Sequence, residues 1–143
     1  MTRAVLDDHL LRDLLADDVG DDLAELLSRH EPATTNLYYV RLCRSVVAAP
    51  GGRLTGSWPI ERRRALGRVL VELPQTVEIV PLRSLAYSMA ELADGYGVSM
   101  LGAEAVASAQ HLAAPLCVWG GDDGPRIRAA AGGTGTDYRT VAR

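Results

Sequence analysis

Apolar residues follow two alternating patterns along the chain, short runs typical of strands and longer spacings typical of helices. The run Arg3–Leu6 predicts a first strand, and leucines at helical spacing follow from Asp8 onward. Later runs predict strands at Val77–Val80 and Leu116–Trp119, with an edge strand at Tyr138–Val141. Because helices separate these strands, the pattern predicts an α/β fold of three layers (α/β/α), with a mainly parallel sheet between two layers of helices.

The helices are predicted from apolar positions that recur with a 3.6-residue period. The chain breaks at Pro32–Thr35, which supplies an N-cap for the next helix, and breaks again at Pro50–Gly52. Arg53–Pro59 is expected to be a loop, with Ser57 and Pro59 opening the helix that follows. The predicted helices are Asp8–Leu15, Asp21–Ser28, Leu37–Val47, Ile60–Val71, Leu85–Ala93, Leu101–Leu112 and Arg126–Ala131.

The length of 143 residues fits one domain, and no repeat or long linker divides the chain, so we expect a single domain over 1–143. The longest apolar stretch, Leu112–Trp119, is far shorter than the roughly 20 residues that cross a bilayer. Asp7 and Asp8 also fall where a signal peptide would be apolar. These observations favour a soluble, cytoplasmic protein.

The charged residues exclude several kinds of chemistry. All 15 basic residues are arginine, so Schiff-base chemistry and a P-loop lysine are excluded. The net charge of −3 gives no global attraction for nucleic acid, so RNA would have to bind through a local patch or a metal ion. Cys43 and Cys117 lie far apart and no cysteine or histidine pair has zinc spacing, so we expect two buried free thiols.

Pairs of acidic residues follow two of the predicted strands, Asp7–Asp8 after the first and Asp122–Asp123 after the strand ending at Trp119. In parallel α/β sheets, ligands bind beyond the carboxyl ends of the strands, so these pairs form a candidate site. A structural interpretation stays open for both pairs. Asp8 would cap the first helix, and Asp122–Asp123 stand in a glycine-rich sequence typical of turns.

An acid pair after a first strand is also typical of two-component receiver domains, which bind magnesium there. A receiver further needs a phospho-accepting aspartate after a central strand, but the chain has no aspartate between Asp22 and Asp94. It also needs an active-site lysine, and the chain has none. These two absences exclude the receiver interpretation.

An ordered set of short motifs resembles the PIN-domain family, in particular the PIN ribonucleases of toxin–antitoxin systems. The set starts with Ala4–Asp7 and continues with a helix of the Thr-Thr type over Thr34–Leu42. It ends with Met100–Ala103 at the start of an alanine-rich helix, Ala114–Val118 and Asp122. The resemblance implies a PIN-like fold over most of the chain. It also implies a ribonuclease centre in which three or four carboxylates hold magnesium or manganese.

Only two of the four acidic positions of the PIN family carry an acid here. By the resemblance, Asp7 and Asp122 are the candidate catalytic residues and metal ligands. The second acidic position falls on Arg41 and the third on Gly102, and Glu104 lies on the wrong side of its helix to replace the latter. We expect Arg41 to pair with Asp7 or Asp8 and to stand in for the metal ion. Whether Asp8 or Asp123 replaces a missing acid stays open.

These observations predict a degenerate, non-catalytic PIN-like domain that acts as a binding or regulatory module without a cofactor. The alternative is a Mg- or Mn-dependent ribonuclease of toxin–antitoxin type, and an unrelated α/β function also stays open. The resemblance further implies a homodimer and a small antitoxin-like protein partner, with RNA as another candidate partner. Trp58 would serve as an exposed aromatic anchor, whereas His9 and Arg62–Arg64 are expected on the solvated surface.

Overall fold

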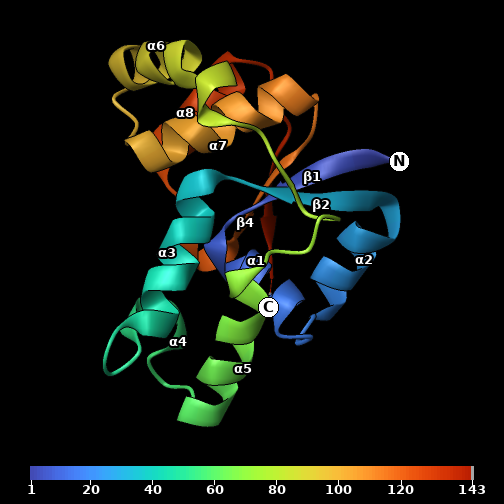
Figure 1. The fold of residues 1–143 in the computed structure, drawn as a ribbon. Coiled ribbons are helices and arrows are strands. Elements are labelled where there is room, and N and C mark those ends of the chain that lie inside the picture. The colour runs from blue at the N-terminus through green and yellow to red at the C-terminus, as the bar shows by residue number, and fades with distance from the viewer. Residues whose placement is uncertain (143) are drawn as a thin grey trace.

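The computed structural model describes residues 1–142, which form an all-parallel, five-stranded sheet with helices on both faces (Figure 1). The predicted three-layer α/β fold is therefore confirmed. The strand order is β3-β2-β1-β4-β5, which makes β1 the central strand. The strands are β1 (Thr2–Leu6), β2 (His30–Thr34), β3 (Glu78–Ile79), β4 (Leu116–Trp119) and β5 (Tyr138–Val141).

Eight α-helices lie within the described residues, and two short 3-10 turns, Leu82–Ser84 and Gly120–Asp122, accompany them. None of these helices has both the length and the hydrophobicity that crossing a lipid bilayer requires. The helices are α1 (Asp8–Leu15), α2 (Asp21–Arg29), α3 (Asn36–Val47), α4 (Gly52–Thr55), α5 (Ile60–Val71), α6 (Ala86–Tyr96), α7 (Met100–Leu112) and α8 (Pro125–Gly133).

The two faces of the sheet carry separate hydrophobic clusters, because successive side chains of a strand point to opposite faces. Val5 of β1 packs with residues of α6, α7 and α8, which lie together on one side of the sheet (Figure 1). Its neighbours Ala4 and Leu6 pack with residues of α1 and α2 on the other side. A third cluster joins α3, α4 and α5 to α1 through Leu42, Leu54, Leu66 and Leu11.

The interior strand β2 is the main element that the sequence pattern does not predict. Pro32 predicts a chain break, but His30–Thr34 pairs in parallel with both β1 and β3. A proline argues against a central strand because it lacks a backbone donor. The predicted N-cap is confirmed, since the Thr35 hydroxyl accepts a hydrogen bond from the Tyr38 backbone N–H at 3.0 Å.

Three predictions for the segment before α5 were wrong. The expected loop Arg53–Pro59 contains most of helix α4, and Ser57 does not cap α5, whose N-cap is Pro59. Trp58 is half-buried rather than an exposed anchor, because the Arg62 guanidinium stacks 3.7 Å from its ring centroid. Arg62 also pairs with Asp18 at 2.9 Å, so part of the predicted solvated arginine face is engaged in contacts.

The two cysteines are free, as predicted, but only one is fully buried. Cys117 of β4 is inaccessible, and burial raises the pKa of its thiol to about 12. Cys43 of α3 is half-buried, which corrects the expectation of two buried thiols. The high pKa of Cys117 makes its thiol unreactive at neutral pH, because the thiolate is the nucleophilic form.

Candidate functional site

The candidate site lies where β1 and β4 end side by side. The chain proceeds from β1 toward one edge of the sheet and from β4 toward the other, so this is the topological switch point where parallel sheets bind ligands. A cavity of about 600 Å³ opens there, and its lining includes Asp7, Asp122 and, from α3, Tyr38 and Arg41. The structure thus brings the two predicted site residues to one cavity, although they are far apart in the sequence.

Asp7 ties the start of α1 to the end of β4. Its Oδ1 accepts a hydrogen bond from the Leu10 backbone N–H at 2.9 Å, and its Oδ2 accepts one from the Trp119 N–H at 3.0 Å. The side chain is almost fully buried, with the residue only 1% exposed. Burial, assisted by the negative charges of Asp8 and Asp122, raises the pKa of Asp7 to about 7 despite these two hydrogen bonds.

Asp8 follows as the first residue of α1. The capping role predicted for Asp8 belongs to Asp7, which is the N-cap of this helix. One oxygen of Asp8 accepts the His9 backbone N–H at 3.0 Å, whereas Oδ2 is buried and has no hydrogen-bond partner within residues 1–142. Nη1 of Arg41 lies 3.4 Å from this Oδ2, which confirms the predicted pairing of Arg41 with the acid pair.

His9 is buried, which contradicts its predicted place on the surface. Its ring packs against the indole of Trp119 with the ring centroids 4.4 Å apart, because β4 returns beside the first turn of α1. Its Nδ1 contacts Oδ2 of Asp122 and lies 3.4 Å from Oδ1 of Asp8. His9 therefore joins the cluster between the two carboxylates.

Asp122 lies in the 3-10 turn after β4 and forms an ion pair with a second arginine, Arg53. Its Oδ1 accepts a hydrogen bond from Nη2 of Arg53 at 2.8 Å. Asp123 is directed elsewhere, since it accepts hydrogen bonds from Arg128 at 2.7 Å and from the Tyr138 hydroxyl at 2.9 Å. These two hydrogen bonds lower the pKa of Asp123. Asp123 therefore does not replace a missing acid in the cluster.

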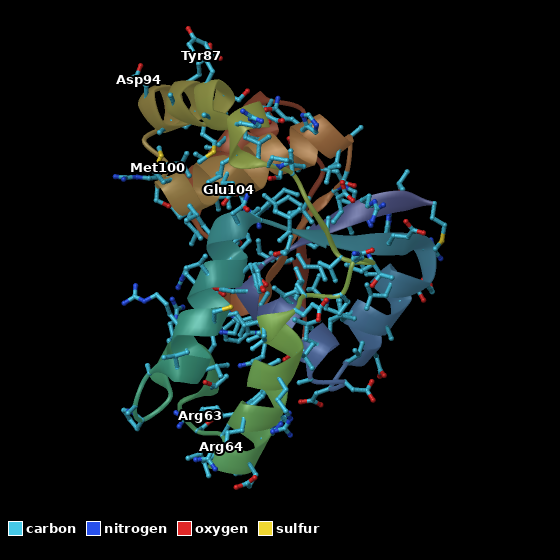
Figure 2. All side chains as sticks on the ribbon, viewed as in Figure 1. Arg63, Arg64, Tyr87, Asp94, Met100 and Glu104 are labelled. Atoms are coloured by element: carbon cyan, nitrogen blue, oxygen red, sulfur yellow. The ribbon has the colours of Figure 1, made fainter. Side chains whose placement is uncertain are left out.

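At Gly102, where the resemblance implies the third acidic position, any side chain would require Val98 to move. Gly102 lines the cavity at the start of α7, but a β-carbon there would lie 2.5 Å from Cγ2 of Val98. Glu104 instead faces the start of α3 (Figure 2), where Oε1 accepts the Leu37 backbone N–H at 2.8 Å. Its Oε2 accepts the Asn36 backbone and side-chain N–H groups at 3.0 and 2.8 Å. Glu104 therefore holds α3, and its role was missed although a lone acid in an alanine-rich helix was a signal for it.

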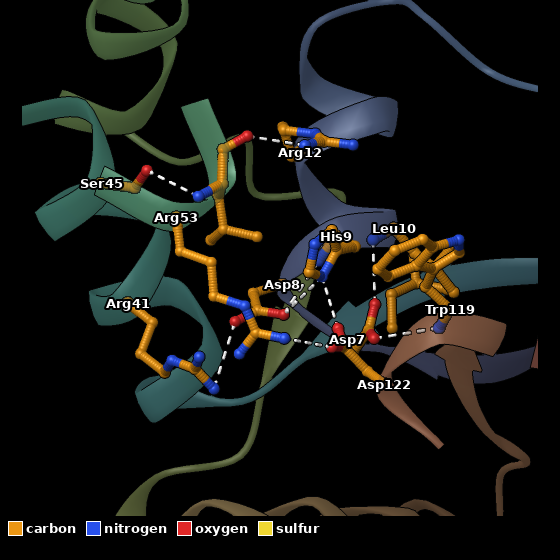
Figure 3. Close-up of polar contacts among 12 residues, drawn as sticks. Asp7, Asp8, His9, Leu10, Arg12, Arg41, Ser45, Arg53, Trp119 and Asp122 are labelled. Carbon is orange, nitrogen blue, oxygen red and sulfur yellow. Dashed lines mark hydrogen bonds and ion pairs between the residues drawn. The ribbon is translucent and has the colours of Figure 1, made fainter. Parts of the chain in front are cut away.

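The cluster has the spacing of a metal site but not its charge. One ligand atom from each of Asp7, Asp8, His9 and Asp122 can be chosen so that all four lie within 4.8 Å of one another. Magnesium and manganese prefer carboxylate oxygens with no competing cation. Two of the three carboxylates are already paired with guanidinium groups, those of Arg41 and Arg53, which both point at the cluster (Figure 3). In this arrangement the residues do not fit a divalent ion.

Comparisons with known proteins reveal a similar fold in one solved structure but no related sequence. No protein-family model matches the chain, and no curated protein matches it in sequence. Among solved structures, the chain is similar to one described as a toxin–antitoxin complex from Klebsiella pneumoniae. The TM-score is 0.54 and the sequence identity 17%, over 84% of this chain and 88% of that one. At such identity, the similarity establishes that the two chains share their fold.

Proposed function

We propose that this chain is a non-catalytic, PIN-like binding or regulatory module related to toxin–antitoxin systems. The observation that carries the proposal is the pair of arginines, Arg41 and Arg53, bound to Asp8 and Asp122. The ion pairs neutralise two of three carboxylates where a hydrolytic relative would hold its metal ion. The similarity in fold to a protein of a toxin–antitoxin complex supports the relation.

The fixed charges favour arginines over a divalent ion at this site. Asp7 has a pKa near 7, so it carries only part of a negative charge at neutral pH. Arg41 and Arg53 add two positive charges within 3.4 Å of the other carboxylates. A divalent ion would therefore meet a cluster whose two full carboxylate charges are already balanced by arginines, and it would have to displace both guanidinium groups.

A Mg- or Mn-dependent ribonuclease of toxin–antitoxin type is the second candidate. The observation in its favour is the close set of Asp7, Asp8, His9 and Asp122 at the end of the central strands. A metal ion there would activate water and stabilise the charge that develops during phosphodiester cleavage. This candidate requires Arg41 and Arg53 to leave the cluster, which their partly exposed side chains would allow.

Calorimetric titration with Mn²⁺ tests the proposal. The unmodified protein is expected to bind no Mn²⁺, because the two arginines occupy the carboxylates. The double substitution Arg41→Ala, Arg53→Ala should create a measurable Mn²⁺ site, and adding Asp122→Asn should abolish it. Arg64→Ala is the matched control, since Arg64 is exposed and lies 3.8 Å from Glu61, its only partner among residues 1–142.

One result would establish the ribonuclease instead. The unmodified protein would bind Mn²⁺, lose that binding on Asp122→Asn, and cleave single-stranded RNA in a reaction that a chelator stops. If neither the unmodified protein nor the double variant binds Mn²⁺, the arginines are not what excludes the ion, and the proposal fails.

We also propose that the chain forms a homodimer and binds a small antitoxin-like protein. Large side chains are exposed on the outer helices, including Tyr87 of α6 at 81% and Met100 of α7 at 49% (Figure 2). Light scattering on the purified protein should give twice the chain mass of 15.3 kDa. A mass equal to that of one chain would contradict the homodimer and would leave the arrangement of the candidate site unaffected.

A further inference from the structure

A second, smaller cavity adjoins the candidate site on the side of α3 and α4. It has a volume of about 220 Å³ and shares Arg41 and Arg53 with the larger cavity as a common wall. Its third charged lining residue is Arg44, one turn beyond Arg41 on α3. Among the described residues that line this cavity, three are arginines and none is acidic, so its charge is opposite to that of the acid cluster.

The backbone around the smaller cavity is firmly held. The Ser45 hydroxyl donates to the Gly51 carbonyl at 2.7 Å and accepts the backbone N–H groups of Leu54 and Thr55. Gly52, with φ +62°, lets α4 approach α3, because a β-carbon there would lie 3.1 Å from Cα of Ser45. These contacts fix Arg53 of α4 beside Arg41 and Arg44 of α3.

The three guanidinium groups retain free donors. Arg44 is exposed, and its guanidinium makes no ion pair or hydrogen bond to any residue of the described chain. Arg41 and Arg53 each use one nitrogen in an ion pair, whereas a guanidinium carries five N–H donors. The side chains of Arg41 and Arg53 are 38% and 64% exposed, so their remaining donors are accessible from the solvent. An incoming anion would therefore bind the donors of Arg41 and Arg53 that the two ion pairs leave free.

We propose that Arg41, Arg44 and Arg53 bind the terminal phosphoryl group of a phosphomonoester, carried by a free nucleotide or by the 5′ end of an RNA. A phosphomonoester has a charge of about −1.5 to −2 and three acceptor oxygens, which suits a cavity lined by three arginines and no acid. A carboxylate or an internal phosphodiester brings a single charge and fewer free oxygens. The proposal goes beyond the binding-module function and holds whether or not the acid cluster binds a metal ion.

Fluorescence anisotropy at low ionic strength, with a chelator present, tests the proposal. The probes are two single-stranded oligoribonucleotides of one sequence, one with a 5′-phosphate and one with a 5′-hydroxyl. The phosphorylated probe should bind at least about tenfold more tightly. Arg44→Ala should remove that preference, whereas Arg64→Ala, an equal loss of charge on α5, should preserve it. Competition by adenosine monophosphate would assign a free nucleotide as the ligand, and its failure to compete would assign an RNA end.

Several outcomes would overturn the proposal. They are equal affinity for the two probes, absence of binding by both probes and by the mononucleotide, and a preference that survives Arg44→Ala. Because Arg44 is exposed and unpaired, its substitution should leave folding intact, which circular dichroism would verify. The chelator separates this test from the Mn²⁺ titration, so either proposal can fail while the other stands.

Discussion

Glu104→Ala is expected to lower the free energy of unfolding by roughly 3–5 kcal/mol, as for other buried charged networks that lose one partner. Glu104 is fully buried and accepts three hydrogen bonds from the start of α3. The backbone N–H groups of Asn36 and Leu37 would lose their acceptor, at about 1–3 kcal/mol per group, whereas the Asn36 side chain would keep its hydrogen bond to the Val80 carbonyl. Equilibrium denaturation in urea would measure the change.

Glu104→Gln separates the charge from the shape of this side chain. The amide keeps the volume but turns an NH₂ group toward donors of α3, so we expect an intermediate loss of roughly 2–3 kcal/mol. Glu91→Ala, on the exposed face of α6, is the control and should change stability by about 0.5 kcal/mol or less. If all three variants unfolded at the same urea concentration, Glu104 would not hold α3 in place.

Local patterns in the sequence were sufficient to predict much of the fold. The apolar runs at β1 and β4 and the leucine spacings of the helices predict the three-layer arrangement. They do so because a buried face makes apolar residues recur at the period of its helix or strand. The same periodicity put Arg41 on the inward side of α3, and its ion pair with Asp8 confirms that part of the hypothesis. β2 was missed because His30, Glu31 and Pro32 have none of the features of a central strand.

The parts of the site that sequence could not predict depend on contacts between distant segments. Arg53 and Asp122 are 69 positions apart, and their pairing depends on the close packing of α4 against α3 at Ser45 and Gly52. His9 is buried only because β4 brings Trp119 beside it. No periodicity encodes such contacts, since they arise from how the elements pack after they have formed.

Asp7 should make the protein less stable as the pH rises from about 4 to about 7. Its pKa in the folded protein is about 7, compared with 3.8 as its ordinary value. Below pH 4 the carboxyl is protonated in both the folded and unfolded chains, so it contributes no pH dependence. Between these values the unfolded chain releases a proton that the folded chain keeps, which favours unfolding by about 1.4 kcal/mol per pH unit. Above pH 7 the loss is complete, at roughly 4 kcal/mol.

Asp7→Asn isolates this contribution, because the amide has nearly the shape of the protonated carboxyl and does not titrate. Urea denaturation of both proteins should give similar stabilities near pH 4, and the variant should then become progressively more stable than the unmodified protein up to pH 7. Asp94→Asn, on the exposed surface of α6 (Figure 2), controls for the loss of a formal charge and should leave the pH profile unchanged. A constant difference between Asp7→Asn and the unmodified protein across this range would mean that Asp7 is ionised throughout. The cluster would then hold three full negative charges against two arginines, a net charge of about −1 that would make the metal-dependent candidate more favourable.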